Sequence, residues 1–354
     1  MSLAELKAAG LRRAMRRPHS KSRGAHPSRK PWVHKKNVAM ALAEALLARN
    51  SSQLNVLQIG ANLGDFNVEQ HFSVRSELKD DTTRMGIKML LDNPNTRAVL
   101  VEANPSIFGR LNASLTHYLN GSTRMLAVNA VACEREASKP VNFYRVVPER
   151  LLERLPHAPY WAQTELNSMD LALASLGLKA ILPRREHASV AAYFETLKLP
   201  CEGPQTLLRR GNSDPAALDV LYVDIEGYDA NIVDGFLNVS TFRPKLVSFE
   251  AHIAPFVPEL RPTLRRVLRW LVLHGYRVAC CNTLCGGFFF SRWKRQPSEH
   301  FRRACGRGDH NAMAWDPRQL NDFTTRGTEY EAFEWDMWGG SRMLPPAREQ
   351  RELG

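Results

Sequence analysis

The stretch that decides the fold is LNVLQIGANLG, residues 54–64, in which an apolar run of strand length ends in a glycine-rich turn. A strand followed by Gly60-x-Asn62-x-Gly64 is typical of the first strand of an α/β sheet, because small residues let the backbone approach a ligand closely. The turn is not the dinucleotide-binding Gly-x-Gly-x-x-Gly, since Asn62 replaces the second glycine, and no Gly-Lys-Ser or Gly-Lys-Thr indicates a phosphate-binding loop. Taken alone, the pattern also occurs in turns that bind nothing.

Strands and helices alternate on both sides of this stretch, which predicts a parallel sheet covered by helices. Short apolar runs without polar alternation favour strands that are buried on both faces. The predicted fold class is therefore α/β, with a doubly wound, mostly parallel sheet and helical insertions. Further strands are expected at 98–102, 124–132, 141–146, 218–225, 245–250, 276–281 and 287–291, and helices at 37–49, 106–119, 229–237 and 259–274.

The chain of 354 residues carries a net charge of +12, which is concentrated at its start. Residues 1–40 hold eleven Lys and Arg against one Glu, whereas the rest holds 37 basic and 35 acidic side chains. A basic leader therefore precedes a nearly neutral body, either as an organellar transit peptide or as a disordered arm on a cytoplasmic protein. We expect the main domain at 41–316, with insertions at about 66–97 and 148–215, and a polar C-terminal extension at 317–354. No apolar run is long enough to predict a transmembrane segment.

Six cysteines are spread over the chain without the dense, regular spacing of a small disulfide-stapled domain. Cys280, Cys281 and Cys285, with Cys305 and His310 downstream, fit no common zinc spacing. We therefore expect structural thiols and assign no metal site.

Several expected strands end in residues that can do chemistry. Glu102 ends the strand at 98–102, Asp224 and Glu226 come at the end of the strand at 218–225, and Glu250 is followed closely by His252. The carboxyl ends of parallel strands meet at one rim of a sheet, where ligands bind. A carboxylate after the second strand can accept hydrogen bonds from both ribose hydroxyls of a nucleoside-containing cofactor. Together with the glycine-rich turn, these strand ends favour an enzyme that uses such a cofactor.

These segments resemble the FkbM-like S-adenosylmethionine-dependent methyltransferases over about residues 54–292. The resemblance implies a seven-stranded, Rossmann-like class I methyltransferase sheet with a reversed final hairpin, and S-adenosylmethionine as the cofactor. Five pieces carry it, in the same order: VLQIGANLG at 56–64, LVEANP at 100–105, NAVA at 129–132, LYVDIEGYD at 221–229, which is the most specific, and PKLVSFE at 244–250.

The chain departs from the family pattern in two places. Leu63 stands where many relatives carry Asp, and the acid comes two positions later, at Asp65. Glu102 follows Gly60 by 42 residues, whereas about 20 is usual for a simple crossover. The extra residues, 66–97, are therefore expected to form a helix or loop near the substrate entrance.

Carried over residue by residue, the resemblance implies that the glycine-rich turn approaches the methionine part of the cofactor and that Glu102 binds the ribose. Asn129 and Ala130 would lie near the adenine, and Asp224 and Glu226 would border the donor methyl and the acceptor. The residues expected at the cofactor are Gln58, Gly60, Asn62, Gly64, Asp65, Glu102, Asn104, Asn129, Ala130 and Asp224.

The family implies methylation of an oxygen, here a hydroxyl of a small molecule or sugar. Such an acceptor must lose its proton as the bond to the methyl carbon forms, and Asp224, Glu226 and His252 are the candidate bases. His252 titrates nearest neutrality but can equally be a structural residue at a strand end. Two alternatives stay open: a non-catalytic cofactor-binding or regulatory module of the same fold, and a nucleic-acid-associated methyltransferase to which the basic leader contributes.

Overall fold

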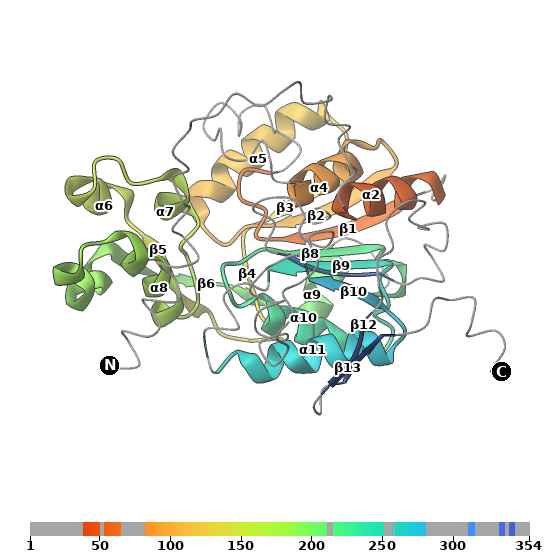
Figure 1. Cartoon of the computed structure of the whole chain (residues 1–354). Coiled ribbons are helices and arrows are strands. Elements are labelled where there is room, and N and C mark those ends of the chain that lie inside the picture. Colours follow the sequence, from red (N-terminus) through yellow and green to blue (C-terminus); the bar gives the residue numbers. More distant parts are fainter. Residues whose placement is uncertain are drawn as a thin grey trace, which may run out of the picture.

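Figure 1 shows a computed structural model of the chain, in which a central sheet lies between two layers of helices. The structure describes residues 38–49, 53–64, 82–210, 215–250, 257, 259–280, 311–315, 333–336 and 340–343. The basic leader up to residue 37 and most of the expected C-terminal extension lie outside the described residues. Within the described part, no helix combines the length and the apolar character needed to cross a membrane.

The central sheet has seven strands, which in chain order are β1 (Leu54–Ile59), β2 (Thr96–Val101), β3 (Met125–Val128), β8 (Val220–Val223), β9 (Leu246–Glu250), β10 (Arg277–Cys280) and β11 (Asn311–Trp315). Their order across the sheet is β10-β11-β9-β8-β1-β2-β3. Parallel pairing runs from β3 to β9, whereas β11 is antiparallel to both of its neighbours, β9 and β10. The predicted fold class, a doubly wound and mostly parallel sheet, is confirmed.

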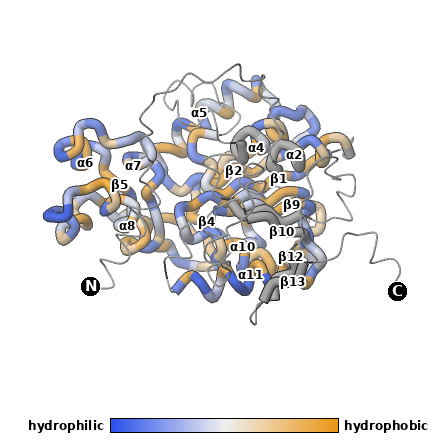
Figure 2. The backbone as a smooth tube through the Cα atoms, viewed as in Figure 1, coloured by the Kyte–Doolittle hydropathy of each residue, from blue (hydrophilic) through white to orange (hydrophobic). Residues whose placement is uncertain are grey.

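Helices cover both faces of this sheet: α2 (Val38–Arg49), α4 (Thr82–Asp92) and α5 (Pro105–Leu119) on one, and α9 (Pro204–Arg210), α10 (Asp229–Leu237) and α11 (Arg261–Leu273) on the other. In β1, Leu54 and Val56 belong to the core under α2, α4 and α5, whereas Leu57 and Ile59 belong to the core under α10 and α11. Because both faces are buried, the strands need no polar alternation. Figure 2 shows the hydrophobic colour along these central strands.

The structure places one expected strand differently and does not describe another. The run at 124–132 splits at Asn129 into β3 and a short β4 (Val131–Ala132), which leaves the sheet and pairs with β7 (Cys201–Glu202). The final strand expected at 287–291 lies outside the described residues, and the strand that pairs with both β9 and β10 is β11. The sequence did not predict β11. A run of five residues shows no local pattern that would indicate pairing with β9, which lies about 60 residues earlier in the chain.

Between β4 and β7 the chain forms a lobe at one end of the sheet, at the left in Figure 1. This insertion lobe, residues 141–199, has a core of its own in which Leu151, Ala162 and Leu178 are fully buried. It contains an antiparallel pair of strands, formed by its first and last segments, as well as the helices that the sequence predicted. Its elements are β5 (Val141–Val146), α6 (Pro148–Arg154), α7 (Tyr160–Thr164), α8 (Leu171–Ile181), the 3-10 helix η3 (Arg184–Tyr193) and β6 (Phe194–Leu199).

A disulfide joins Cys133 to Cys201 where the chain enters and leaves the insertion lobe, with the two Cα atoms 5.8 Å apart. The bond lies beside the parallel pair of β4 and β7, in which Val131 is opposite Cys201. The expectation of structural thiols concerned Cys280, Cys281, Cys285 and Cys305, and no pairing was predicted for Cys133 and Cys201. Their separation of 68 residues hid the pairing, because only the fold brings them together.

Gly60 lies where the turn after β1 comes closest to the end of β8. It has a φ of 79°, and a Cβ atom at this position would stand 1.8 Å from the carbonyl oxygen of Asp224. Any side chain would therefore push the two strand ends apart. Gly109, in α5, offers a contrast, because no atom lies within 4 Å of the position that its Cβ would take.

Replacing both Cys133 and Cys201 with Ser is expected to lower the free energy of unfolding by about 2–4 kcal/mol, because a disulfide restricts the unfolded chain. Urea unfolding followed by tryptophan fluorescence, with and without a reductant, measures the change. The reductant should destabilise the natural chain and leave the double variant unaffected. Equal midpoints for the natural chain in the two buffers would contradict the bond.

Gly60→Ala is expected to reduce the free energy of unfolding by about 4 kcal/mol or more, because the added methyl meets backbone that cannot move aside cheaply. Gly109→Ala is the matched control and should gain about 0.5–1 kcal/mol from helix propensity. Thermal unfolding of both variants beside the natural chain decides between them. Equal stability of the two variants would refute the close approach of Gly60 to Asp224.

Candidate functional site

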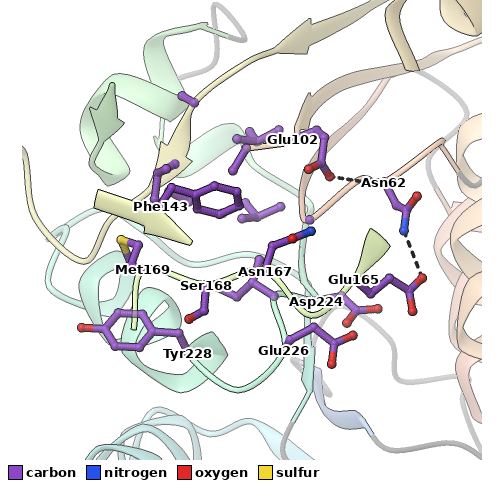
Figure 3. A pocket seen from close by; sticks show the side chains of 18 of the residues that line it. Asn62, Glu102, Phe143, Glu165, Asn167, Ser168, Met169, Asp224, Glu226 and Tyr228 are labelled. Carbon is purple, nitrogen blue, oxygen red and sulfur yellow. Dashed lines mark hydrogen bonds between the residues drawn. The ribbon is translucent and has the colours of Figure 1, made fainter. Parts of the chain in front are cut away.

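The carboxyl ends of β1, β2 and β8 open onto one pocket, which spans about 710 Å³ when the space at its mouth is included. Figure 3 shows that side chains from the strand ends face side chains of the insertion lobe across it. Glu102, Asp224 and Glu226 line it from the sheet, and Phe143 and Glu165 line it from the lobe.

The turn after β1 is held by backbone hydrogen bonds and by left-handed residues. The N–H groups of Gly60 and Ala61 both donate to the carbonyl of Val101, at 2.9 and 3.0 Å, which ties the turn to the end of β2. Three residues have positive φ: Gly60 at 79°, Asn62 at 49° and Gly64 at 86°. Glycine and asparagine are the residues that adopt this conformation most readily, so the sequence Gly-x-Asn-x-Gly specifies the turn.

Glu102 joins this turn to the one after β2. Its side chain is only 8% exposed, and it accepts hydrogen bonds from the N–H groups of Asn62, at 2.9 Å, and Asn104, at 2.8 Å. Burial raises the pKa of Glu102 to about 7; the two N–H groups oppose this shift and the nearby charge of Glu165 adds to it. The carboxyl therefore changes its charge near neutral pH, inside the pocket.

A second strained turn follows β8. Glu226 has a φ of 61° and Gly227 one of 109°, and Asp229, at the start of α10, accepts hydrogen bonds from the N–H groups of Ile225 and Gly227 at 3.1 and 2.9 Å. Burial raises the pKa of Asp229 to about 7, with a further contribution from Asp224. The segment Asp224 to Asp229 is therefore a turn whose shape depends on a fully buried carboxyl.

Six of the expected site residues line the pocket: Gly60, Asn62, Glu102, Ala130, Asp224 and Glu226. Gly64, in the same turn as Gly60 and Asn62, is not among the lining residues. Three others support the wall from behind. Gln58 is buried within β1, Asn104 caps α5 by accepting a hydrogen bond from the N–H of Ser106, and Asn129 donates to the carbonyl of Glu102 at 2.8 Å. Asp65 and His252 lie outside the described residues, so their roles stay predictions.

The insertion lobe supplies pocket residues that sequence reasoning did not name, among them Phe143, Glu165 and Met169. Phe143 lies in β5, and the other two lie in the segment after α7. None of them follows a strand of the main sheet, and none belongs to a motif. The sequence indicated only that an insertion is present in this region, and it did not indicate which residues of the insertion line the pocket.

The pocket is lined by acidic side chains and by no basic ones among the described residues. Four carboxylates line it, those of Glu102, Glu165, Asp224 and Glu226, and no Lys, Arg or His is among the described lining residues. Burial raises the pKa of Glu226 well above its usual range, and the charge of Glu250 raises it further. A pocket of this kind favours a ligand with a positively charged group.

A cluster of carboxylates behind the pocket has the spacing of a cation site. Asp224, Asp229 and Glu250 each place one carboxylate oxygen within 4.8 Å of the other two. Both oxygens of Asp229, however, already accept hydrogen bonds from backbone N–H groups of its own turn. We therefore assign Asp229 to the support of that turn and assign no metal to the cluster.

No protein-family model and no curated protein matches the sequence. Among solved structures, the chain is similar to precorrin-6y C5,15-methyltransferase from Geobacter metallireducens GS-15, with 15% identity, coverage of 81% of this chain and 93% of that one, and a TM-score of 0.31. It is also similar to cofactor-bound Rv0187 from MTB, with 12% identity, coverage of 89% and 90%, and a TM-score of 0.29. At these identities and TM-scores the similarity does not indicate a function. The fold assignment rests on the strand order of the sheet.

Proposed function

We propose that the protein is an S-adenosylmethionine-dependent methyltransferase that methylates a hydroxyl of a small molecule or sugar. The observation that carries the proposal is the hydrogen bond from the N–H of Asn62 to the carboxylate of Glu102. It joins, in one pocket, the two parts expected of a nucleoside-cofactor site: a glycine-rich turn and an acid after the second strand. The antiparallel β11 in an otherwise parallel sheet supports the same class.

The residues of the pocket fit this cofactor. Asn62 is 9% exposed, and its Oδ1 atom is buried without a hydrogen-bond partner among the described residues. A buried acceptor of this kind favours a ligand that brings an N–H group, as the amino group of the methionine part does. Glu102 would accept from the ribose hydroxyls, and the apolar side chains of Ala130, Val131 and Phe143 would lie against the adenine.

The chain's own contribution to methyl transfer is positioning, charge and a place for a proton. When bound, S-adenosylmethionine supplies a methyl group on a positively charged sulfonium, which the acidic pocket favours. Glu226 lines the pocket with a pKa well above the usual range, because of its burial and the charge of Glu250. A carboxylate with that proton affinity can take the proton of an acceptor hydroxyl. Asp224, which accepts a hydrogen bond from the hydroxyl of Tyr222 at 3.1 Å, would orient the reacting groups.

Calorimetry with S-adenosylhomocysteine tests the cofactor site. The natural chain is expected to bind it, and Glu102→Gln should weaken binding by roughly 10–100-fold, because hydrogen bonds to a charged acceptor contribute about 1.5–3 kcal/mol. Glu153→Gln is the matched control, since Glu153 lies exposed on α6, and should bind as the natural chain does. Failure of both S-adenosylmethionine and S-adenosylhomocysteine to bind at high micromolar concentration would overturn the proposed function.

A screen of hydroxyl-bearing acceptors, followed by release of S-adenosylhomocysteine, tests the role of Glu226. With an acceptor in hand, Glu226→Gln is expected to lower turnover by about 100-fold or more, the usual contribution of a general base, while cofactor affinity changes little. Cofactor binding without transfer to any acceptor would instead support a regulatory module of the same fold. Full turnover by Glu226→Gln would assign the proton to another group, such as His252.

A further inference from the structure

Glu165 is the residue of the insertion lobe that reaches the glycine-rich turn. It follows directly after α7, and its carboxylate accepts a hydrogen bond from Nδ2 of Asn62 at 3.0 Å. In Figure 3, Glu102, Asn62 and Glu165 stand in a row, joined by two hydrogen bonds that Asn62 donates. A residue 103 positions away along the chain thus contacts the turn that ends β1.

The packing of the lobe fixes the place of Glu165. Ala162 and Leu166, three positions before and one after it, are both buried in the core of the lobe. The N–H of Glu165 donates to the carbonyl of Trp161 at 2.8 Å, and Oδ1 of Asn167 accepts from the N–H of Val146 at 3.1 Å. The carboxylate is therefore presented by the fold of the lobe, and it contacts the turn from outside the sheet.

The contact with Glu165 stabilises Asn62 in an uncommon conformation. Its φ of 49° is uncommon for a residue with a side chain, and its amide is buried at the pocket wall. The hydrogen bond from Nδ2 to Glu165 fixes the orientation of that amide, which leaves Oδ1 directed away from the carboxylate. Glu165 thereby determines which atom of Asn62 a ligand can meet.

Glu165 also brings a second negative charge close to Glu102, and that charge adds to the effect of burial in raising the pKa of Glu102. Other charged groups lie on the elements packed near Glu102. Arg145 of β5 contacts Oδ1 of Asn104 and pairs with Glu195, and the carboxylates of Asp224 and Glu226 line the pocket from the end of β8.

We propose that Glu165 is a positioning residue of the cofactor pocket, through which the insertion lobe holds Asn62 and keeps a negative charge beside the carboxylate expected to bind ribose. The inference rests on the proposed function. It makes cofactor affinity depend on pH, because ribose hydroxyls donate to an ionised carboxylate and Glu102 must lose its proton to accept from both. Affinity therefore rises as the pH passes through about 7, the pKa of Glu102. Removal of the charge at position 165 lowers that pKa and moves the rise to lower pH.

Calorimetric titration with S-adenosylhomocysteine between pH 5.5 and 8.5 (about the range in which the carboxyl titrates) compares the natural chain with Glu165→Gln and Glu165→Ala. Gln keeps an acceptor for Asn62 and removes the charge, so the midpoint of the affinity rise should move to lower pH. Ala removes both the charge and the acceptor, so it should show the same shift and should also bind about 10-fold more weakly at pH 8.5, where Glu102 is ionised in every variant. Glu153→Gln, in the same lobe but exposed, is the control and should change neither quantity.

Proton release on binding distinguishes an electrostatic role of Glu165 from a purely structural one, because a structural role would leave it unchanged. Near pH 6.5, below the pKa of Glu102, binding to the natural chain should release a proton, and calorimetry in buffers of different ionisation enthalpy measures it. Glu165→Gln should release less. Because Glu165 also raises the pKa of Glu226, a repeat in the Glu226→Gln background assigns the proton to Glu102.

The outcomes separate the two proposals. Binding by the natural chain with the same midpoint and proton release in Glu165→Gln would overturn the role of Glu165 and leave the proposed function standing. Absence of binding by the natural chain at every pH would overturn both. A shifted midpoint in Glu165→Gln, with folding verified by circular dichroism, supports the inference.

Discussion

The buried carboxylate of Glu102 is the interaction on which the arrangement of the pocket depends. It lies at the end of β2 and accepts hydrogen bonds from backbone N–H groups of two different turns, those of Asn62 and Asn104. A carboxylate in this place costs free energy through desolvation, and the two hydrogen bonds offset part of that cost. Each turn is therefore kept in place by the same side chain, and the turn after β1 cannot move without leaving a buried acceptor unsatisfied.

The pocket is formed by two units with different origins. The sheet supplies strand ends that any doubly wound fold brings to one rim, and the insertion lobe supplies an apolar wall with Phe143 and Met169 and one more acid, Glu165. The lobe is attached to the main sheet through the pair of β4 and β7, and the disulfide between Cys133 and Cys201 lies beside that pair. The lobe has its own core, but it also packs against the main body, because Phe143 shares a cluster with Val131 and Leu173 belongs to the core of the sheet.

The sequence predicted the sheet well and the lobe side of the pocket poorly, and the reason is physical. The strand at 54–59, the strand at 141–146 and the helix at 229–237 are found at the expected residues, because each carries a local pattern of apolar spacing and turn residues. Glu102 was found because an acid at a strand end is visible in the sequence. Glu165 follows a five-residue helix and reaches Asn62 only through tertiary packing, as do Cys133 and Cys201, so no local pattern marks them.

The residue types in the motif at 224–229, the most specific of the chain, are required by the shape of the backbone as much as by chemistry. Glu226 carries a side chain at a φ of 61°, a conformation that costs free energy, and Gly227 follows it at 109°. Asp229 compensates by accepting from the N–H groups on either side of Glu226, those of Ile225 and Gly227. The turn that Asp229 supports places Glu226 at the wall of the pocket. Asp229, which was not among the expected site residues, therefore supports the turn, whereas Asp224 and Glu226 line the pocket.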